Sequence, residues 1–303
     1  MNHITALDEP FPTPQALASA TKSHVQNHFR ISTRKLPISK SGPIDALTDQ
    51  IGIPMPEMIF GDNLVSITHL PSGWTIAFTT PDALDAVDKT DKHMLKVAYA
   101  RDWESTREDT TQKIKEVVKP YDWSYSTTYD GTIEQPEDAA TQYKLEPTTK
   151  TIPIELLKRR DPMLFFDEVV LFESELDDNG VSIYSAKVRV HEKRMLLLVR
   201  LFMRLDNVIV RIRDTRVYVD FETDEVIREY TAKEGTFAEV KRVSPTRTKL
   251  ILQTKSHQPL TMPQALQLSG RLPDDITVAL RDPYTLDPLL KVKEQKTEAV
   301  SFK

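Results

Sequence analysis

The sequence contains no cysteine among its 303 residues. This absence excludes disulfide bonds, thiolate nucleophiles and cysteine-ligated zinc, and it fits a reducing compartment. Glycine is scarce, with 8 residues, and no Gly-rich phosphate loop, Walker pattern or Gly-x-Ser-x-Gly elbow is present. The common signatures of nucleotide-binding proteins and serine hydrolases are therefore missing.

An excess of basic charge and a long apolar run are missing too. The formal net charge is -5 at pH 7, whereas proteins that bind nucleic acid or anionic lipid usually carry a positive footprint. The longest apolar run, residues 195–199, is far shorter than the roughly 20 residues that span a bilayer. The N-terminus lacks the basic and apolar regions of a secretory signal. We expect a soluble protein of the cytoplasm, and also of the nucleus, that binds neither nucleic acid nor membranes.

Histidines and carboxylates give little support for catalysis. His24 and His28 have the i, i+4 spacing of a helix, but the glutamate of a His-Glu-x-x-His motif is absent. We expect both side chains to be exposed to solvent. Acidic pairs are frequent, yet Asp177-Asp178 precedes Asn179-Gly180 and most simply forms a turn. A carboxylate- or metal-dependent hydrolase stays open as an alternative, but we expect no enzyme activity, no metal and no cofactor.

The first half of the chain mixes helical and strand patterns. Residues 1–35 show little periodicity and predict a partly disordered segment. Residues 41–51 carry apolar residues at helical spacing, and Gly52 ends the predicted helix. Alternation predicts strands at residues 64–68, 74–78 and 94–99.

A second helix is expected to begin at Thr80-Pro81-Asp82. Thr80 is the predicted cap, Pro81 suits the first helical position, and Asp82 lies near the positive end of the helix dipole. Two charged stretches, residues 104–115 and 134–141, are expected to be surface insertions because they would bury little apolar area.

The second half predicts an antiparallel meander. Its expected strands are residues 181–190, 195–203, 208–213, 217–221 and 226–230. The almost continuous apolar run at 195–203 suits a central strand with both faces covered.

Beyond residue 241 the chain is rich in proline and irregular, with residues 247–253 and 276–280 as candidate edge strands. Residues 291–303 predict a flexible tail. We expect one α+β domain over residues 36–290, an antiparallel sheet with a few peripheral helices.

One aromatic block has two interpretations. Tyr121, Trp123 and Tyr125 alternate, so they would share one face of a strand. They either pack against the sheet or line a groove that accepts a peptide side chain, since Trp and Tyr offer large contact area at low entropic cost.

A charged block lies between two predicted strands, at Arg213-Asp214-Thr215-Arg216. In one interpretation, Arg213, Asp214 and Arg216 form a surface ion cluster worth about 1 kcal/mol at most. In the other, Arg216 or Lys96 meets a carboxylate of a partner, for which a guanidinium offers a bidentate fork.

Six blocks resemble one family in their order and spacing. They are Met58–Asn63, Met94–Ala98, Lys119–Tyr125, Phe165–Glu173, Arg213–Arg216 and Arg228–Thr231. Together they are similar to the TIP-forty-one-like family, the TOR signalling pathway regulator-like proteins, over roughly residues 40–235.

The resemblance implies a regulator that is not an enzyme. Members of that family bind the catalytic subunits of type 2A and related phosphatases, including the short acidic-aromatic C-terminal tail, in a groove on a β-rich body. We therefore expect type 2A, type 4 and type 6-like catalytic subunits as partners, and the alpha-four-type phosphatase-associated protein as a further one. A monomer is expected, and a structural adaptor with an unrelated partner remains the second alternative.

Partner-binding positions follow from matching motif to motif. The resemblance implies Asp82, Ile152, Ile212 and Asp214, with Ile212 standing where the animal-type pattern has Met. The aromatic and carboxylate arguments above add four more: Lys96, Trp123, Tyr125 and Arg216. The hypothesis is that the two isoleucines anchor the partner, and that the two aspartates set its register.

Overall fold

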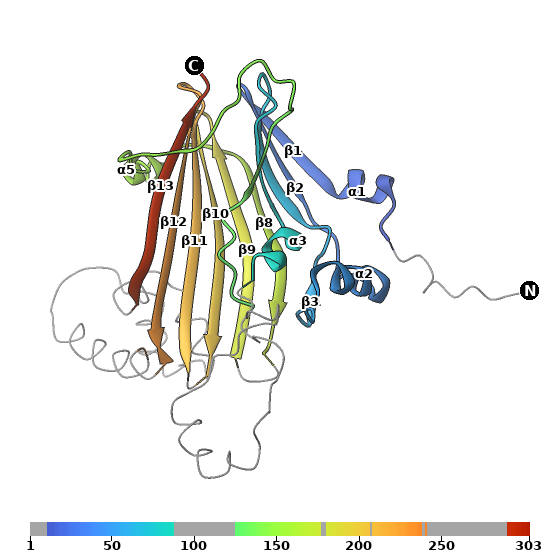
Figure 1. The fold of residues 1–303 in the computed structure, drawn as a ribbon. Coiled ribbons are helices and arrows are strands. Elements are labelled where there is room, and N and C mark those ends of the chain that lie inside the picture. Colours follow the sequence, from blue (N-terminus) through green and yellow to red (C-terminus); the bar gives the residue numbers. More distant parts are fainter. Residues whose placement is uncertain (1–10, 88–124, 177–179, 207, 238–239, 241–289) are drawn as a thin grey trace, which may run out of the picture.

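The computed structural model describes residues 11–87, 125–176, 180–206, 208–237, 240 and 290–303, which form two antiparallel sheets with a few short helices (Figure 1). The five-stranded sheet consists, in order, of β1 (Thr21–Gln26), β2 (Phe29–Arg34), β4 (Leu64–His69), β5 (Thr75–Thr79) and β6 (Thr132–Glu134). The helices are α1 (Pro14–Ala20), α2 (Ser41–Ile51), α3 (Thr80–Asp85) and α5 (Ile154–Leu157). The α+β class expected from the sequence is confirmed.

The eight-stranded sheet is built around a meander of long strands. Its order is β3 (Met58–Ile59), β8 (Met163–Ser174), β9 (Gly180–His191), β10 (Arg194–Leu205), β11 (Ile209–Asp220), β12 (Glu225–Thr236), β13 (Lys291–Ser301) and β7 (Glu146–Pro147). From β8 to β12 each strand pairs with the next one in sequence, as short connections favour.

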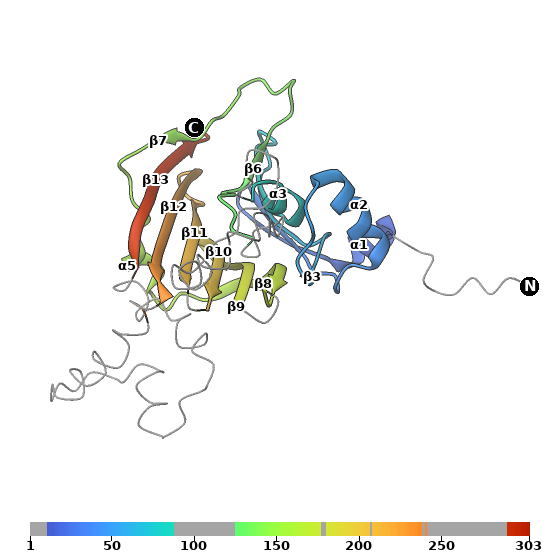
Figure 2. The ribbon, with the colours of Figure 1, turned by 60° about the horizontal axis from the view of Figure 1, so that its bottom comes forward.

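The two faces of this sheet have different surroundings. Its concave side, here called the inner face, faces α3 and the five-stranded sheet, whereas α5 lies on the other side, the outer face (Figure 2). Side chains alternate, so Leu197, Val199 and Leu201 of β10 lie in the main core with Ile31 and Ile67 of the five-stranded sheet. The core thus sits between the two sheets.

Several predicted elements are confirmed. The helix at 41–51 ends at Gly52, whose φ of 76° is the left-handed conformation that glycine adopts at little cost. The predicted hairpin at 64–78 is β4 and β5. Thr79 rather than Thr80 caps α3, because its side chain accepts a hydrogen bond from the Asp82 amide at 3.3 Å.

Predicted disorder is wrong for much of both ends. Residues 14–34 form α1, β1 and β2, because Phe29 and Ile31 of β2 are fully buried in the core. The predicted tail at 291–303 instead forms β13, which pairs along β12 and buries Val300. In both segments, backbone pairing to a neighbouring strand orders residues that are mostly polar.

Two predictions about the meander are corrected. The strands expected at 208–213 and 217–221 are one strand, β11, so the charged block lies within a strand and not between two. The run at 195–203 is fully covered on one face only, because Leu196 and Leu198 on the outer face are partly exposed, although Phe202 near its end is buried there.

Of the surface insertion predicted at 134–141, Glu134 ends β6, and residues 135–141 are mostly exposed as expected. The elements predicted at 94–99, 104–115, 247–253 and 276–280 lie outside the described residues. Within the described ranges, no helix is both long and apolar enough to cross a bilayer.

Candidate functional site

The outer face of the eight-stranded sheet carries a groove with a volume of about 720 Å³. The apolar side chains of its lining are Ile154, Leu157, Ile183, Leu196, Leu198 and Phe202. They come from α5, β9 and β10, where alternation directs every second side chain away from the core. The groove can therefore bury apolar groups of a ligand without disturbing the main core.

Basic side chains dominate the polar part of the groove. They are Lys158, Lys187, Arg189, Arg200 and Arg216, and Glu168 is the one acidic lining residue in the part of the chain that the structure describes. Lys187 Nζ lies 2.9 Å from Glu168 Oε1, and both side chains are about half exposed. This concentration of cations on an acidic chain favours an acidic ligand, because local potential and not net charge steers association.

Asp214 holds one of these cations in place. Its two carboxylate oxygens accept hydrogen bonds from Nε and Nη2 of Arg200, each at 2.7 Å. Asp214 is only 7% exposed, so this bidentate pair is largely desolvated and geometrically fixed. Arg216 lies further from the same carboxylate, at 3.8 Å, and remains 37% exposed in the groove.

The alternative ion cluster of Arg213, Asp214 and Arg216 is corrected by this geometry. Arg213 pairs across the strand with Ala232, whereas Asp214 pairs with Thr231, and adjacent side chains point to opposite faces. Asp214 therefore meets Arg200 of the neighbouring strand instead of Arg213.

The predicted isoleucines lie at the two ends of this outer face. Ile152 is buried with Tyr218 and Ile227, and its amide donates a hydrogen bond to Glu229 Oε1 at 2.9 Å. Burial, with nearby Asp220 adding to it, raises the pKa of Tyr218 to about 12.

At the other end Ile212 is 4% exposed and packs with Phe202, Val210, Val240 and Leu290. From Leu196 to Phe202, β10 runs about 20 Å between the two clusters, at 3.4 Å per residue. Both isoleucines are buried beside the ends of the groove and present little surface to a ligand.

Asp82 is not brought to this face. It lies on the inner side with α3, and its Oδ2 accepts hydrogen bonds from Thr132 Oγ1 at 2.7 Å and from Tyr129 at 3.1 Å. Burial raises the pKa of Tyr129 well above its usual range, and the Asp82 charge adds to that rise. Asp82 thus ties α3 to β6 and the preceding loop.

Of the aromatic block, only Tyr125 is described. It is 6% exposed with a φ of 44°, and its ring lies edge-on to Phe172 at 6.5 Å, which favours the packing interpretation for this residue. Trp123 and Lys96 lie outside the described residues.

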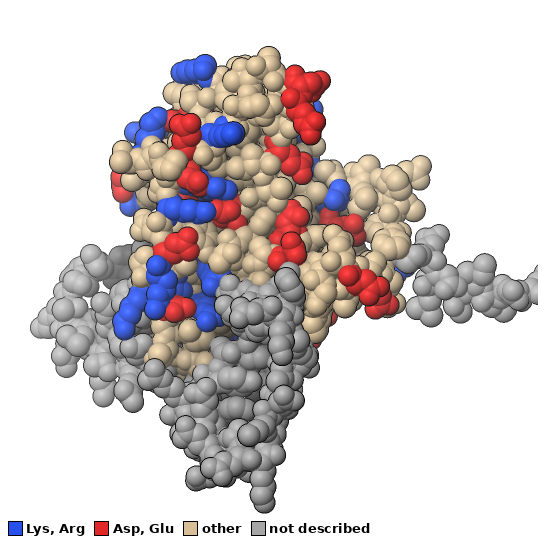
Figure 3. Space-filling model, in the orientation of Figure 1, with Lys and Arg blue, Asp and Glu red and all other residues tan. Residues whose placement is uncertain are grey.

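The concave side carries charges of both signs, which alternate over β12 and β13 (Figure 3). Arg228 pairs with Glu298 at 2.5 Å, and Glu234 accepts from Arg211 and Lys293, both at 3.2 Å. Burial opposes the ionised form of Glu234, but these two cations outweigh it and lower the pKa. Paired charges of this kind are less available to a partner than the exposed Arg189 and the partly exposed Arg216 of the groove.

Arg189, Lys187 and Arg200 were missed as site residues. The alternation of β9 does place the first two on one face with Ile183, which is a signal in the sequence. In β10, Arg194, Arg200 and Arg204 occur at even positions only, and this spacing marks a solvent-facing side within an otherwise apolar run.

Comparison with known proteins gives consistent results. The TIP41-like family model matches residues 58–241. A human TIP41-like protein is 41% identical over 219 residues, covering 72% of this chain and 78% of the relative. The type 2A phosphatase activator TIP41 of Saccharomyces cerevisiae is 38% identical over 229 residues, 71% of this chain and 63% of the relative. Its namesake in Schizosaccharomyces pombe is 33% identical over 218 residues, 72% and 84% respectively.

Proposed function

This chain belongs to the TIP41-like family, and from that premise we propose that it is a non-catalytic regulator of type 2A-like protein phosphatases. The names of the two yeast relatives, type 2A phosphatase activators, support the phosphatase as the partner. The proposal places the phosphatase catalytic subunit on the outer face of the eight-stranded sheet, with its C-terminal tail in the groove.

The observation that carries this proposal is the composition of the groove. Its apolar residues, Leu196 and Leu198 among them, offer pockets for aromatic side chains, and the exposed Arg189 and the partly exposed Arg216 offer partners for carboxylates. A short acidic-aromatic tail needs both kinds of contact. Arginine suits the second because its planar fork binds carboxylates with two hydrogen bonds.

The residues predicted from the sequence act here mostly by positioning others. Asp214 fixes Arg200 at the groove, and Ile212 packs beside Phe202 on the neighbouring strand. Ile152 packs near Leu157 and Leu196 at the opposite end. Changes at these buried positions would weaken binding by disordering the groove surface, while Arg216 makes a direct contact.

The finer parts of the proposal extend to cellular context. The protein binds type 4 and type 6-like catalytic subunits as well, and acts with the alpha-four-type phosphatase-associated protein. It works as a monomer in the cytoplasm and nucleus, within TOR signalling. By occupying the catalytic subunit it controls both its activity and its assembly with scaffold and regulatory partners.

Calorimetry with a purified type 2A catalytic subunit tests the central claim. The full chain should bind the intact subunit and bind a subunit lacking its C-terminal tail at least tenfold more weakly, which corresponds to about 1.4 kcal/mol. Equal affinity for both forms would show that the tail does not bind in the groove. No binding to either form would refute the phosphatase proposal.

A matched pair of charge reversals locates the interface. Arg189→Glu changes an exposed groove residue of β9, and Arg30→Glu changes an exposed residue of β2 in the other sheet. The first should lower affinity for the intact subunit by tenfold or more, because it places like charges together, and the second should leave it unchanged. The reverse pattern would place the interface on the five-stranded sheet.

A further inference from the structure

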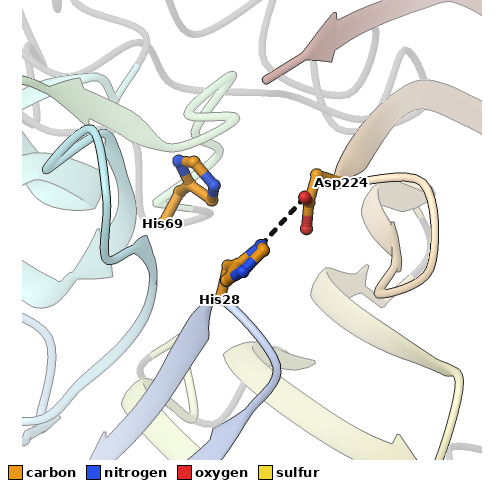
Figure 4. Close-up of side chains that lie close together, drawn as sticks. All are labelled: His28, His69 and Asp224. Carbon is orange, nitrogen blue, oxygen red and sulfur yellow. Dashed lines mark hydrogen bonds and ion pairs between the residues drawn. The ribbon is translucent and has the colours of Figure 1, made fainter. Parts of the chain in front are cut away.

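Three side chains distant in the sequence converge at one end of the two sheets (Figure 4). His28 follows β1 in its turn to β2, His69 ends β4, and Asp224 lies in the turn between β11 and β12. His28 and Asp224 are 196 residues apart in sequence. One possible ligand atom from each residue lies within 4.8 Å of the others.

We propose that His28, His69 and Asp224 form a zinc site that fastens the five-stranded sheet to the β11–β12 turn. Two imidazole nitrogens and one carboxylate oxygen are ligands that Zn²⁺ accepts, and a water or a partner side chain completes a tetrahedron. Mg²⁺ and Ca²⁺ fit poorly because they prefer oxygen ligands. The site is independent of the groove and of the phosphatase proposal.

The surroundings of His69 hold its ring as a fixed ligand. The side chain of this residue is buried, with the whole residue 4% exposed, and Nδ1 is 2.8 Å from Ser72 Oγ. Phe302 stacks on the ring with centroids 4.0 Å apart, and Phe29 packs at 5.1 Å. Engagement of Nδ1 leaves Nε2 for the metal, an arrangement in which a second interaction orients a ligating imidazole.

Asp224 supplies the second, independent observation. Its Oδ2 lies 2.9 Å from His28 Nδ1, but its Oδ1 is buried and has no hydrogen-bond partner among the described residues. A buried carboxylate oxygen without a partner is costly, and a cation beside it would remove that cost.

The backbone around Asp224 is tied down from two sides. Its carbonyl accepts a hydrogen bond from the Phe302 amide at 3.0 Å, and Asn27 Nδ2 donates to the Phe221 carbonyl at 2.7 Å. The second bond joins the β1–β2 turn to the region of the β11–β12 turn.

The arrangement needs only a small closure to bind the ion. Ligand atoms of a tetrahedral zinc site lie about 3.3 Å apart, given bonds of about 2.0 Å. The His28 side chain is 58% exposed, so it can rotate toward the other two without repacking the core. The pair of His24 and His28 considered from the sequence does not form a metal site, because residues 21–26 form a strand and not a helix. His24 instead stacks on Phe165, with ring centroids 5.8 Å apart.

The test uses the full chain without a histidine tag, stripped with EDTA and titrated with ZnCl₂ by calorimetry at pH 7.5. We expect one zinc per chain, at least tenfold weaker binding in His28→Ala, and unchanged binding in His24→Ala. His28 is the better variant because it is exposed, whereas replacing buried His69 would confuse loss of metal with loss of packing. No saturable binding, or equal binding in His28→Ala, would overturn the proposal, as would loss of binding in His24→Ala.

Two further measurements check the ligands. Zinc should raise the melting temperature of the wild-type chain and not that of His28→Ala, while MgCl₂ should shift neither. Co²⁺ should give visible absorption bands of a tetrahedral site in the wild-type chain, and Asp224→Asn should lose them. A cobalt spectrum unchanged by Asp224→Asn would show that the Asp224 carboxylate is not a ligand of the metal.

Discussion

The two faces of the eight-stranded sheet use the same strands for different purposes. On β10 the odd-numbered residues, such as Leu197 and Leu201, are fully buried against the five-stranded sheet. The even-numbered ones, such as Leu198 and Arg200, line a groove that the main core does not fill. Strand alternation therefore separates folding from recognition within one segment, so neighbouring residues should respond differently to the same change.

The largest expected effect comes from the inner face. Leu197→Ala should lower the free energy of unfolding by about 3 kcal/mol, because it removes a fully buried side chain and leaves a cavity. Leu198→Ala, one residue later on the outer face, should cost less than about 1 kcal/mol but weaken phosphatase binding. Urea unfolding measures the first quantity and calorimetry the second. Similar losses of stability in both variants would contradict the division between the faces.

The second-largest effect on stability should come from the buried ion pair of Arg200 and Asp214 at the groove. Asp214→Asn leaves the Arg200 guanidinium without a full negative partner and should destabilise the fold by about 2 kcal/mol. Glu168→Gln changes an exposed carboxylate on the same face and should stay within about 0.5 kcal/mol. Equal values for the two variants in urea unfolding would show that the Asp214 pair is solvated.

The sequence predicted the parts of this fold in which a periodic pattern is strong. The meander, α2 and the β4–β5 hairpin are confirmed, because alternation or helical spacing marks a buried face. The first hairpin and β13 were missed because their burial depends on partners far away in the chain. Lys291–Ser301 is mostly polar, and it is held as a strand by pairing with β12.

The candidate site shows a similar limit. Ile212, Asp214 and Arg216 share the outer face because they alternate on one strand, which a sequence can indicate. The pairing of Asp214 with Arg200 depends on the register of β10 against β11, and no local pattern fixes that register. The meeting of His28 with Asp224 depends on how the two sheets pack.

A smaller effect on the inner face should depend on pH. Burial favours protonation of Asp167, but hydrogen bonds from Lys35 and Thr33 outweigh it, and the pKa is lower than its usual value. The folded state therefore binds this proton less readily than the unfolded chain, so the stabilisation is present above about pH 4 and is lost as the pH falls further.

Asp167→Asn tests this linkage. The variant should be less stable than the wild-type chain by about 1 kcal/mol at pH 7, and the difference should shrink as the pH falls below about 4. Urea unfolding across this range measures it. A constant difference would mean that the Asp167 charge is not what stabilises the fold.

The smallest effect should be found at the exposed pair of Lys187 and Glu168 on the outer face. Lys187→Gln should change the free energy of unfolding by about 0.5 kcal/mol or less, and added salt should remove that difference. The same change removes one cation from the groove, so it should lower the rate of association with an acidic partner more than it lowers stability. Stopped-flow association at two salt concentrations separates these effects. A loss of stability without a change in association rate would show that Lys187 stabilises the fold and does not contribute to binding.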